Sequence, residues 1–110
     1  VLAPKAGADP MKVYKAIRGG LAGSAVLDAK APMMCARNFT PGGKISINHK
    51  DIKNVLATAH EIDVPLPFTS QLFEVQQTLK AHGHFNDDHA GYVQYFEALA
   101  GVEVKSEETK

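Results

Sequence analysis

Cysteine is nearly absent from this chain of 110 residues, and tryptophan is missing altogether. The one cysteine, Cys35, excludes an internal disulfide and is too little for a zinc site built on paired thiolates. No Cys-His signature surrounds it, so we expect a packed thiol and not a nucleophile. The small cysteine content therefore excludes a disulfide-stapled scaffold.

An excess of charge of either sign is also lacking, because 12 Lys and Arg side chains balance 12 Asp and Glu side chains. Without a basic surface, neither nucleic acid nor an anionic membrane is expected as a partner. No run approaches the roughly 18 apolar residues that a membrane span needs, and a signal peptide is not recognisable. We expect one cytoplasmic domain, since 110 residues with 45% hydrophobic content suffice for a single core.

Strand-like runs are too short for a sheet, so we predict an all-α fold of about five short helices. Asp9 and Pro10 are typical of a helix start, because the carboxylate accepts from free N–H groups and proline is tolerated there. The residues before them are typical of the end of an earlier helix. Ser24 is expected to cap another helix, which Pro32 should end or kink near Ala31.

Two further helices are predicted in the C-terminal half. One follows the connector 63–67, with Thr69 or Ser70 as its cap and Gly83 beyond its end. The last opens at Asn86 or Asp87 and runs to about residue 100. Its expected buried face consists of Tyr92, Val93, Phe96 and Leu99. Residues 105–110 form a polar tail that we expect to be frayed.

The stretch 45–62 is the centre of the predicted fold. Its helical spacing predicts a buried face made of Ile52, Val55, Leu56, Ala59 and Ile62. Asn48, His49, Lys50 and Asp51 are expected in the first turn, where N–H groups are free and the helix dipole is positive. A lysine is unfavourable there unless it meets a carboxylate, a carbonyl or an anionic ligand. Lys50 is therefore either a solvated charge or a ligand-binding residue.

The segment 82–89 holds three histidines and two aspartates, which are good ligands for a transition metal. Their spacing matches neither two histidines on one helical face nor a pair of Cys-x-x-Cys motifs. Carboxylates at this position also suit a helix start. We therefore predict no metal site, and we expect surface or helix-packing roles for His49 and His60.

Four segments together resemble the C-terminal domain of the 3-hydroxyisobutyrate dehydrogenase, or beta-hydroxyacid dehydrogenase, family. They are 12–24 (KVYKAIRGGLAGS), 26–33 (VLDAKAPM), 37–39 (RNF) and 50–52 (KDI). The Lys-Asp pair is typical of the whole family, and the two longest runs are typical of a reductase branch. The resemblance covers residues 1–104 and implies a helical fold similar to the C-terminal domain of 6-phosphogluconate dehydrogenase.

This resemblance implies that residues 1–104 are the substrate and oligomerisation domain of a two-domain enzyme that uses NAD or NADP. The Rossmann domain, the linker helix and the catalytic lysine would then lie upstream of Val1, so no catalytic residue is expected here and the fragment alone should be inactive. Lys50 and Asp51 would be the cofactor-binding residues. The implied reaction is reduction of 2-hydroxy-3-oxopropanoate to glycerate. Homo-oligomers would form through the helical domains.

One position departs from the family pattern. Relatives commonly carry a phenylalanine facing the substrate where this chain has Gly43. Loss of that ring would enlarge or soften the pocket, which leaves the substrate within the hydroxyacid family open. A freestanding helical interaction module and a small metal-binding domain are the alternatives to the enzyme.

Overall fold

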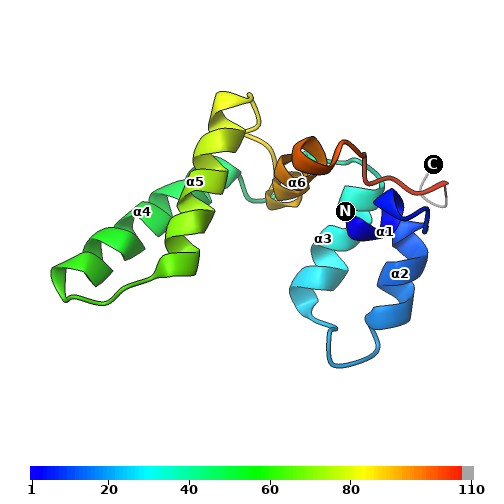
Figure 1. Cartoon of the computed structure of the whole chain (residues 1–110), viewed down its shortest axis with the longest axis horizontal. Helices are drawn as coiled ribbons and strands as arrows, with labels where there is room; N and C mark the ends of the chain where they lie inside the picture. The colour runs from blue at the N-terminus through cyan, green and yellow to red at the C-terminus, as the bar shows by residue number, and fades with distance from the viewer. Residues whose placement is uncertain (108–110) are drawn as a thin grey trace.

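A computed structural model describes residues 1–107, and within them the chain is all-α, as predicted (Figure 1). The helices are α1 (Leu2–Lys5), α2 (Pro10–Ile17), α3 (Ala25–Cys35), α4 (Ile45–Glu61), α5 (Pro67–Ala81), the 3₁₀ helix η1 (His89–Tyr92) and α6 (Val93–Ala100). Extended pairing among these residues is limited to an isolated antiparallel bridge between Lys44 and Asp88. None of the described helices is both long and apolar enough to cross a bilayer.

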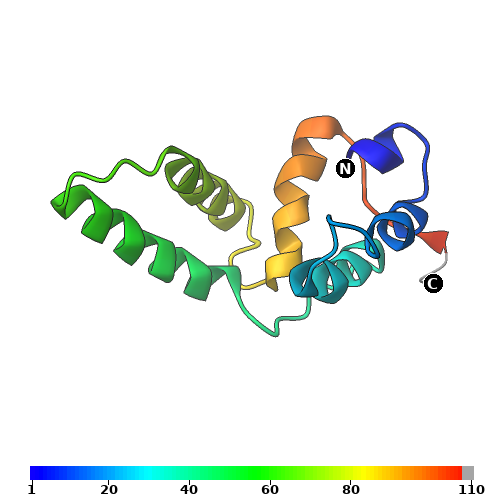
Figure 2. The same cartoon turned by 90° about the horizontal axis from the view of Figure 1, so that it is seen from below.

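The helices form two groups joined by η1 and α6. Helices α4 and α5 make a hairpin that projects to one side, while α1, α2 and α3 lie on the other (Figures 1 and 2). The elongated shape measures 47 × 33 × 26 Å. The core lies between the N-terminal helices and α6, where Met11, Cys35, Val93 and Val104 are buried. The α4–α5 hairpin lies outside this cluster, although Ile45 at the start of α4 and Leu79 near the end of α5 are also fully buried.

The predicted buried face of α4 is only partly correct. Ala59 is buried, but Val55 is 45% exposed and Ile62 is 68% exposed. Helical periodicity identifies the apolar side of a helix, whereas burial requires a neighbour on that side. Helix α5 supplies a neighbour for part of this face, and the exposure of Val55 and Ile62 shows that the rest is open within residues 1–107.

Local capping signals correctly predicted the starts of α2 and α3. Asp9 accepts a hydrogen bond of 2.9 Å from the Met11 N–H, and Ser24 accepts one of 2.9 Å from the Leu27 N–H. Of the two predicted effects of Pro32, an end or a kink, the end is wrong, because α3 continues to Cys35. Cys35 is buried in the core and its carbonyl accepts the Ser106 N–H at 3.0 Å, so tertiary contacts hold this last turn.

The central helix begins earlier than predicted. Helix α4 starts at Ile45 without a side-chain cap, so Lys50 lies in its second turn and not in its first. The Ile45 N–H donates to the Asp87 carbonyl at 3.0 Å, and the Ser46 N–H donates to the Phe85 carbonyl at 2.9 Å. Partners about forty residues away thus satisfy the free N–H groups of this helix start.

The starts of the last two predicted helices also differ from expectation. Helix α5 begins at Pro67, and Leu66 occupies the N-cap position without a side-chain hydrogen bond to the helix. Neither Thr69 nor Ser70 is therefore the cap. Asp88, and not Asn86 or Asp87, accepts the Ala90 N–H at 2.8 Å and caps η1. The predicted glycine ends are confirmed, because Gly83 and Gly101 both have positive φ angles.

The C-terminal segment is docked as far as Ser106. Glu97 accepts hydrogen bonds from the Arg37 guanidinium and from the Val104 N–H. Ser106 is buried and donates its N–H to Cys35. The prediction of a frayed tail is therefore wrong at Ser106, and its last part, 108–110, lies outside the described residues.

Candidate cofactor-contacting site

Lys50 and Asp51 both lie exposed on the second turn of α4. Neither side chain forms an ion pair or hydrogen bond with another side chain in residues 1–107. Lys50 therefore meets no carboxylate within the part of the chain that is described, and it does not lie in the first turn, where a lysine would require one. Its ammonium group is accessible to an anionic ligand.

The opposite face of the same turn is tied to its neighbours by a polar triad, which consists of Asn48 on α4, Gln76 on α5 and Tyr92 on η1. The Asn48 Oδ1 accepts hydrogen bonds from the Tyr92 hydroxyl at 2.6 Å and from the Gln76 Nε2 at 3.0 Å. The Gln76 Nε2 also donates to the Tyr92 hydroxyl oxygen at 2.7 Å. Gln76 is fully buried, and burial raises the pKa of Tyr92. Sequence patterns did not reveal this triad.

His49 packs against the hairpin, which confirms the expected helix-packing role. Its ring stacks on Phe73 at a centroid distance of 4.5 Å and meets the edge of Phe85 at 5.2 Å. Burial, assisted by the charges of Lys80 and Lys53, lowers the pKa of His49. The fold therefore favours the neutral imidazole, and its buried Nε2 has no hydrogen-bond partner within residues 1–107.

Asp88 fixes the loop that leads into α4. Its Oδ1 accepts the N–H groups of Gly42 at 2.9 Å and Gly43 at 3.1 Å, and its Oδ2 accepts that of Ala90 at 2.8 Å. The Lys30 ammonium adds an ion pair at 2.9 Å. Burial alone raises the pKa of Asp88, but these four donors outweigh it and hold the pKa well below its usual range.

The histidine-rich segment 82–89 is occupied by structural contacts of this kind. Asp87 accepts from the Gln94 Nε2 at 2.9 Å and lies 3.2 Å from the His84 Nδ1. Within residues 1–107, no three His, Cys, Asp or Glu side chains converge on a possible metal position. Both aspartates of the segment therefore serve the local fold.

Gly43 lies directly against the ring of His89. A Cβ atom added at Gly43 would come within 3.2 Å of the His89 Cε1, and the His89 N–H donates to the Gly43 carbonyl at 3.0 Å. The absence of a side chain at Gly43 therefore leaves no empty space on this side, because the imidazole fills it. The Nε2 of His89 is buried without a hydrogen-bond partner.

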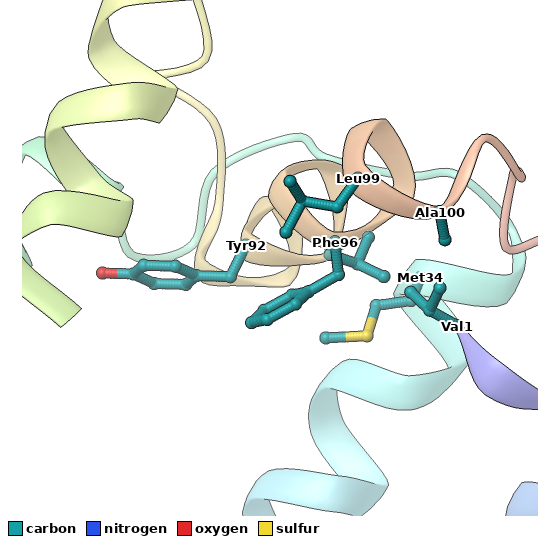
Figure 3. A pocket seen from close by; sticks show the side chains of 7 residues that line it. Val1, Met34, Tyr92, Phe96, Leu99 and Ala100 are labelled. Carbon is teal, nitrogen blue, oxygen red and sulfur yellow. The ribbon is translucent and has the colours of Figure 1, made fainter. Parts of the chain in front are cut away.

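An apolar groove runs along α6, between α3 and α5. One cavity of about 620 Å³ is lined by Val1, Met34, Tyr92, Val93, Phe96, Leu99 and Ala100 (Figure 3). Phe96 is 49% exposed and Leu99 is 72% exposed, so the predicted burial of this face is wrong for both. The Tyr92 ring lines the groove while its hydroxyl points away from Phe96 and Leu99 (Figure 3). Lys50 and Asp51 do not line the groove.

The family follows from comparison with known proteins. Residues 1–96 match the family model described as "NAD-binding of NADP-dependent 3-hydroxyisobutyrate dehydrogenase". The chain belongs to this family. The resemblance seen in the sequence is thereby confirmed over nearly its whole extent.

Within this 3-hydroxyisobutyrate dehydrogenase family, the chain is similar to several named relatives. It is 38% identical over 100 residues to 2-hydroxy-3-oxopropionate reductase of Escherichia coli, covering 91% of this chain and 34% of the relative. It is 27% identical over 105 residues to 2-(hydroxymethyl)glutarate dehydrogenase of Eubacterium barkeri, covering 94% of this chain and 35% of the relative. The chain thus spans about a third of the length of the relatives it matches.

The fold is also found in a solved structure. The crystal structure of a 3-hydroxyisobutyrate dehydrogenase from Salmonella typhimurium superposes with a TM-score of 0.79 at 22% identity. The superposition covers 84% of this chain and 33% of that chain. The helical architecture is therefore that of a domain within a longer dehydrogenase chain.

Proposed function

We propose that the complete protein containing this chain is an NAD(P)-dependent 3-hydroxyacid dehydrogenase that reduces 2-hydroxy-3-oxopropanoate, also called tartronate semialdehyde, to glycerate. The observation that carries the proposal is the match of residues 1–96 to the family model, together with 38% identity to a reductase of that name. A freestanding interaction module is not favoured, because the similarity extends over nearly the whole chain.

The substrate is the finer part of this proposal. Relatives at 25% and 27% identity are named for other hydroxyacids, L-threonate and 2-(hydroxymethyl)glutarate respectively. The higher identity to the reductase favours 2-hydroxy-3-oxopropanoate among them. An assay of the complete protein with these acids and with the semialdehyde, at equal concentrations, tests this choice through kcat/KM. A preference for L-threonate would contradict the proposed substrate.

A nicotinamide cofactor supplies the hydride that reduces the aldehyde carbon when it is bound. Lys50 and Asp51 are proposed to contact this cofactor, and the fit is supported by the exposed and unpaired state of both side chains. The Lys50 ammonium would pair with the anionic groups of the cofactor and help to hold it in place. The family resemblance implies that a lysine outside this chain protonates the product alkoxide, and on that basis we propose that the chain alone is inactive.

Replacement of Lys50 tests this assignment in the complete protein. Lys50→Ala should raise the dissociation constant for NAD(P)H about tenfold or more, because a charge-assisted contact contributes roughly 1.5–3 kcal/mol. The thermal midpoint should hardly change, since Lys50 has no partner among residues 1–107. Cofactor binding can be followed by fluorescence titration.

Lys53→Ala is the matched control, because Lys53 is exposed on the same helix one turn further on. It removes the same charge from α4 and should leave cofactor affinity within about twofold. Equal effects of the two substitutions would mean that the helix attracts the cofactor only through its net charge. No effect of either substitution would contradict the role of Lys50.

A further inference from the structure

The first half of α4 is held by two anchors. Backbone hydrogen bonds join Ile45 and Ser46 to the segment 85–87, which fixes the first turn. The polar triad then joins Asn48 to α5 and η1 by three mutual hydrogen bonds of 2.6–3.0 Å. The side of the helix that carries Lys50, Asn54 and Ala57 is exposed and has no cover within residues 1–107. The direction of α4 therefore depends on its inner face.

Lys50 emerges on the side away from the triad. Two residues advance an α-helix by about 200°, so Asn48 faces the inside of the structure while Lys50 faces outward. The lysine makes no hydrogen bond, ion pair or ring contact within residues 1–107 that would fix its position. Any tilt or rotation of this turn would therefore move the Lys50 ammonium. The four-carbon side chain is itself flexible, so the position of the ammonium depends on a fixed helix turn.

The triad leaves one buried acceptor without a hydrogen bond, so efficient packing alone does not explain its residues. Gln76 is fully buried and its Oε1 has no hydrogen-bond partner. An apolar side chain of similar size at this position would avoid that unsatisfied acceptor. What glutamine provides is the Nε2 group, which reaches both Asn48 and Tyr92. Directional bonds of this kind fix the relative orientation of three elements more narrowly than apolar contact does.

We propose that Tyr92 and Gln76 are positioning residues, which act through Asn48 to orient the turn of α4 that carries Lys50. This inference rests on the proposed function, because it requires Lys50 to contact the cofactor. Tyr92 does not share a surface with Lys50: its ring lines the apolar groove, which Lys50 does not line, and its hydroxyl is engaged in the triad. Its effect on cofactor binding is therefore indirect, and a loosened turn spreads Lys50 over several orientations.

The test uses Tyr92→Phe in the complete protein, with NAD(P)H as the probe. This substitution removes the hydroxyl and keeps the ring in the groove. We expect the dissociation constant for NAD(P)H to rise about three- to tenfold, as for the loss of one internal hydrogen bond. Tyr95→Phe is the matched control, because Tyr95 lies on the adjoining helix α6, stacks edge-on with Phe96, and its hydroxyl has no partner in residues 1–107. It should leave the dissociation constant unchanged.

A double-mutant cycle separates positioning of Lys50 from general loosening of the fold. The effect of Tyr92→Phe should disappear in a Lys50→Ala background, because no ammonium is left to orient. The same loss of affinity in both backgrounds, or no greater loss than with Tyr95→Phe, would overturn the inference and leave the proposed function intact. No effect of Lys50→Ala alone would instead reject the proposed contact of Lys50 with the cofactor, and the inference with it.

Gln76→Met provides a second readout that a merely structural role would not give. It removes the Nε2 donor together with the unsatisfied Oε1, so the thermal midpoint should stay constant or rise. Cofactor affinity should nevertheless fall by about threefold or more. Loss of stability without loss of affinity would overturn the inference.

Discussion

Replacing Asp88 with asparagine removes a negative charge from a side chain that solvent does not reach, since Asp88 is 0% exposed. The carboxylate links three parts of the fold: Lys30 on α3, the loop residues Gly42 and Gly43, and Ala90 on η1. An asparagine oxygen can keep the two glycine N–H groups. Its NH₂ group would then face the Ala90 N–H and the Lys30 ammonium, so donors would oppose donors.

The expected loss is about 3–5 kcal/mol in the free energy of unfolding, which is the cost of breaking a buried ion pair by removing one partner. A domain of this size has about 5–15 kcal/mol in total, so Asp88→Asn should lower the thermal midpoint by roughly 10 °C or more. Urea unfolding followed by far-ultraviolet circular dichroism measures the loss. Asp87→Asn is the control. The carboxylate of Asp87 is next to Asp88 in the chain but only half-buried, so its replacement should cost less than about 1 kcal/mol.

The pH dependence gives an independent check on the same carboxylate. The pKa of Asp88 is lower in the folded protein than its usual value, so the ionised form stabilises the fold above about pH 4. This contribution should decrease as the pH falls below about 4, towards the lowered pKa, and Asp88→Asn should lack that decrease. Equal stabilities of Asp88→Asn and Asp87→Asn would refute the proposal that Asp88 holds these elements together. The same would follow if the stability of both variants fell with decreasing pH as in the wild type.

Two further predictions concern the histidines. Because burial lowers the pKa of His49, the fold favours its neutral form, and the stability of the protein should fall from about pH 7 to about pH 5. His49→Phe should reduce this fall, which thermal midpoints measured across that range would show. An unchanged profile of midpoint against pH would contradict the prediction. Gly43→Ala should destabilise the protein by about 1 kcal/mol, because its Cβ would lie within 3.2 Å of the His89 ring. The penalty should shrink in a His89→Ala background in urea unfolding, and additive effects would show that the ring is not the obstacle.

The family resemblance and the structure support the proposed role of Lys50 in different ways. The Lys-Asp pair suggested a cofactor-binding role through family resemblance, and the family is now shown by the match over residues 1–96. The physical argument from a lysine in a first helical turn was wrong, because α4 begins at Ile45. What makes Lys50 a candidate in the structure is its exposure without a partner.

The sequence by itself determined the features that depend on a few adjacent residues. Asp9 and Ser24 cap their helices through N–H groups two or three positions away, and Gly83 and Gly101 end helices because their own backbone adopts positive φ angles. The all-α class also followed, because amphipathic spacing recurred without any strand pattern. All these signals are local in the chain.

Only the tertiary structure decided the features whose partners lie far apart. The start of α4 depends on carbonyls of residues 85 and 87, and the persistence of α3 beyond Pro32 depends on the docked segment around Ser106. The exposure of Phe96 and Leu99 depends on which elements lie beside α6, which periodicity does not specify. The triad of Asn48, Gln76 and Tyr92 joins three elements that share no motif. A contact between residues 28 or 44 positions apart leaves no periodic pattern in the sequence, so the triad could be found only in the folded chain.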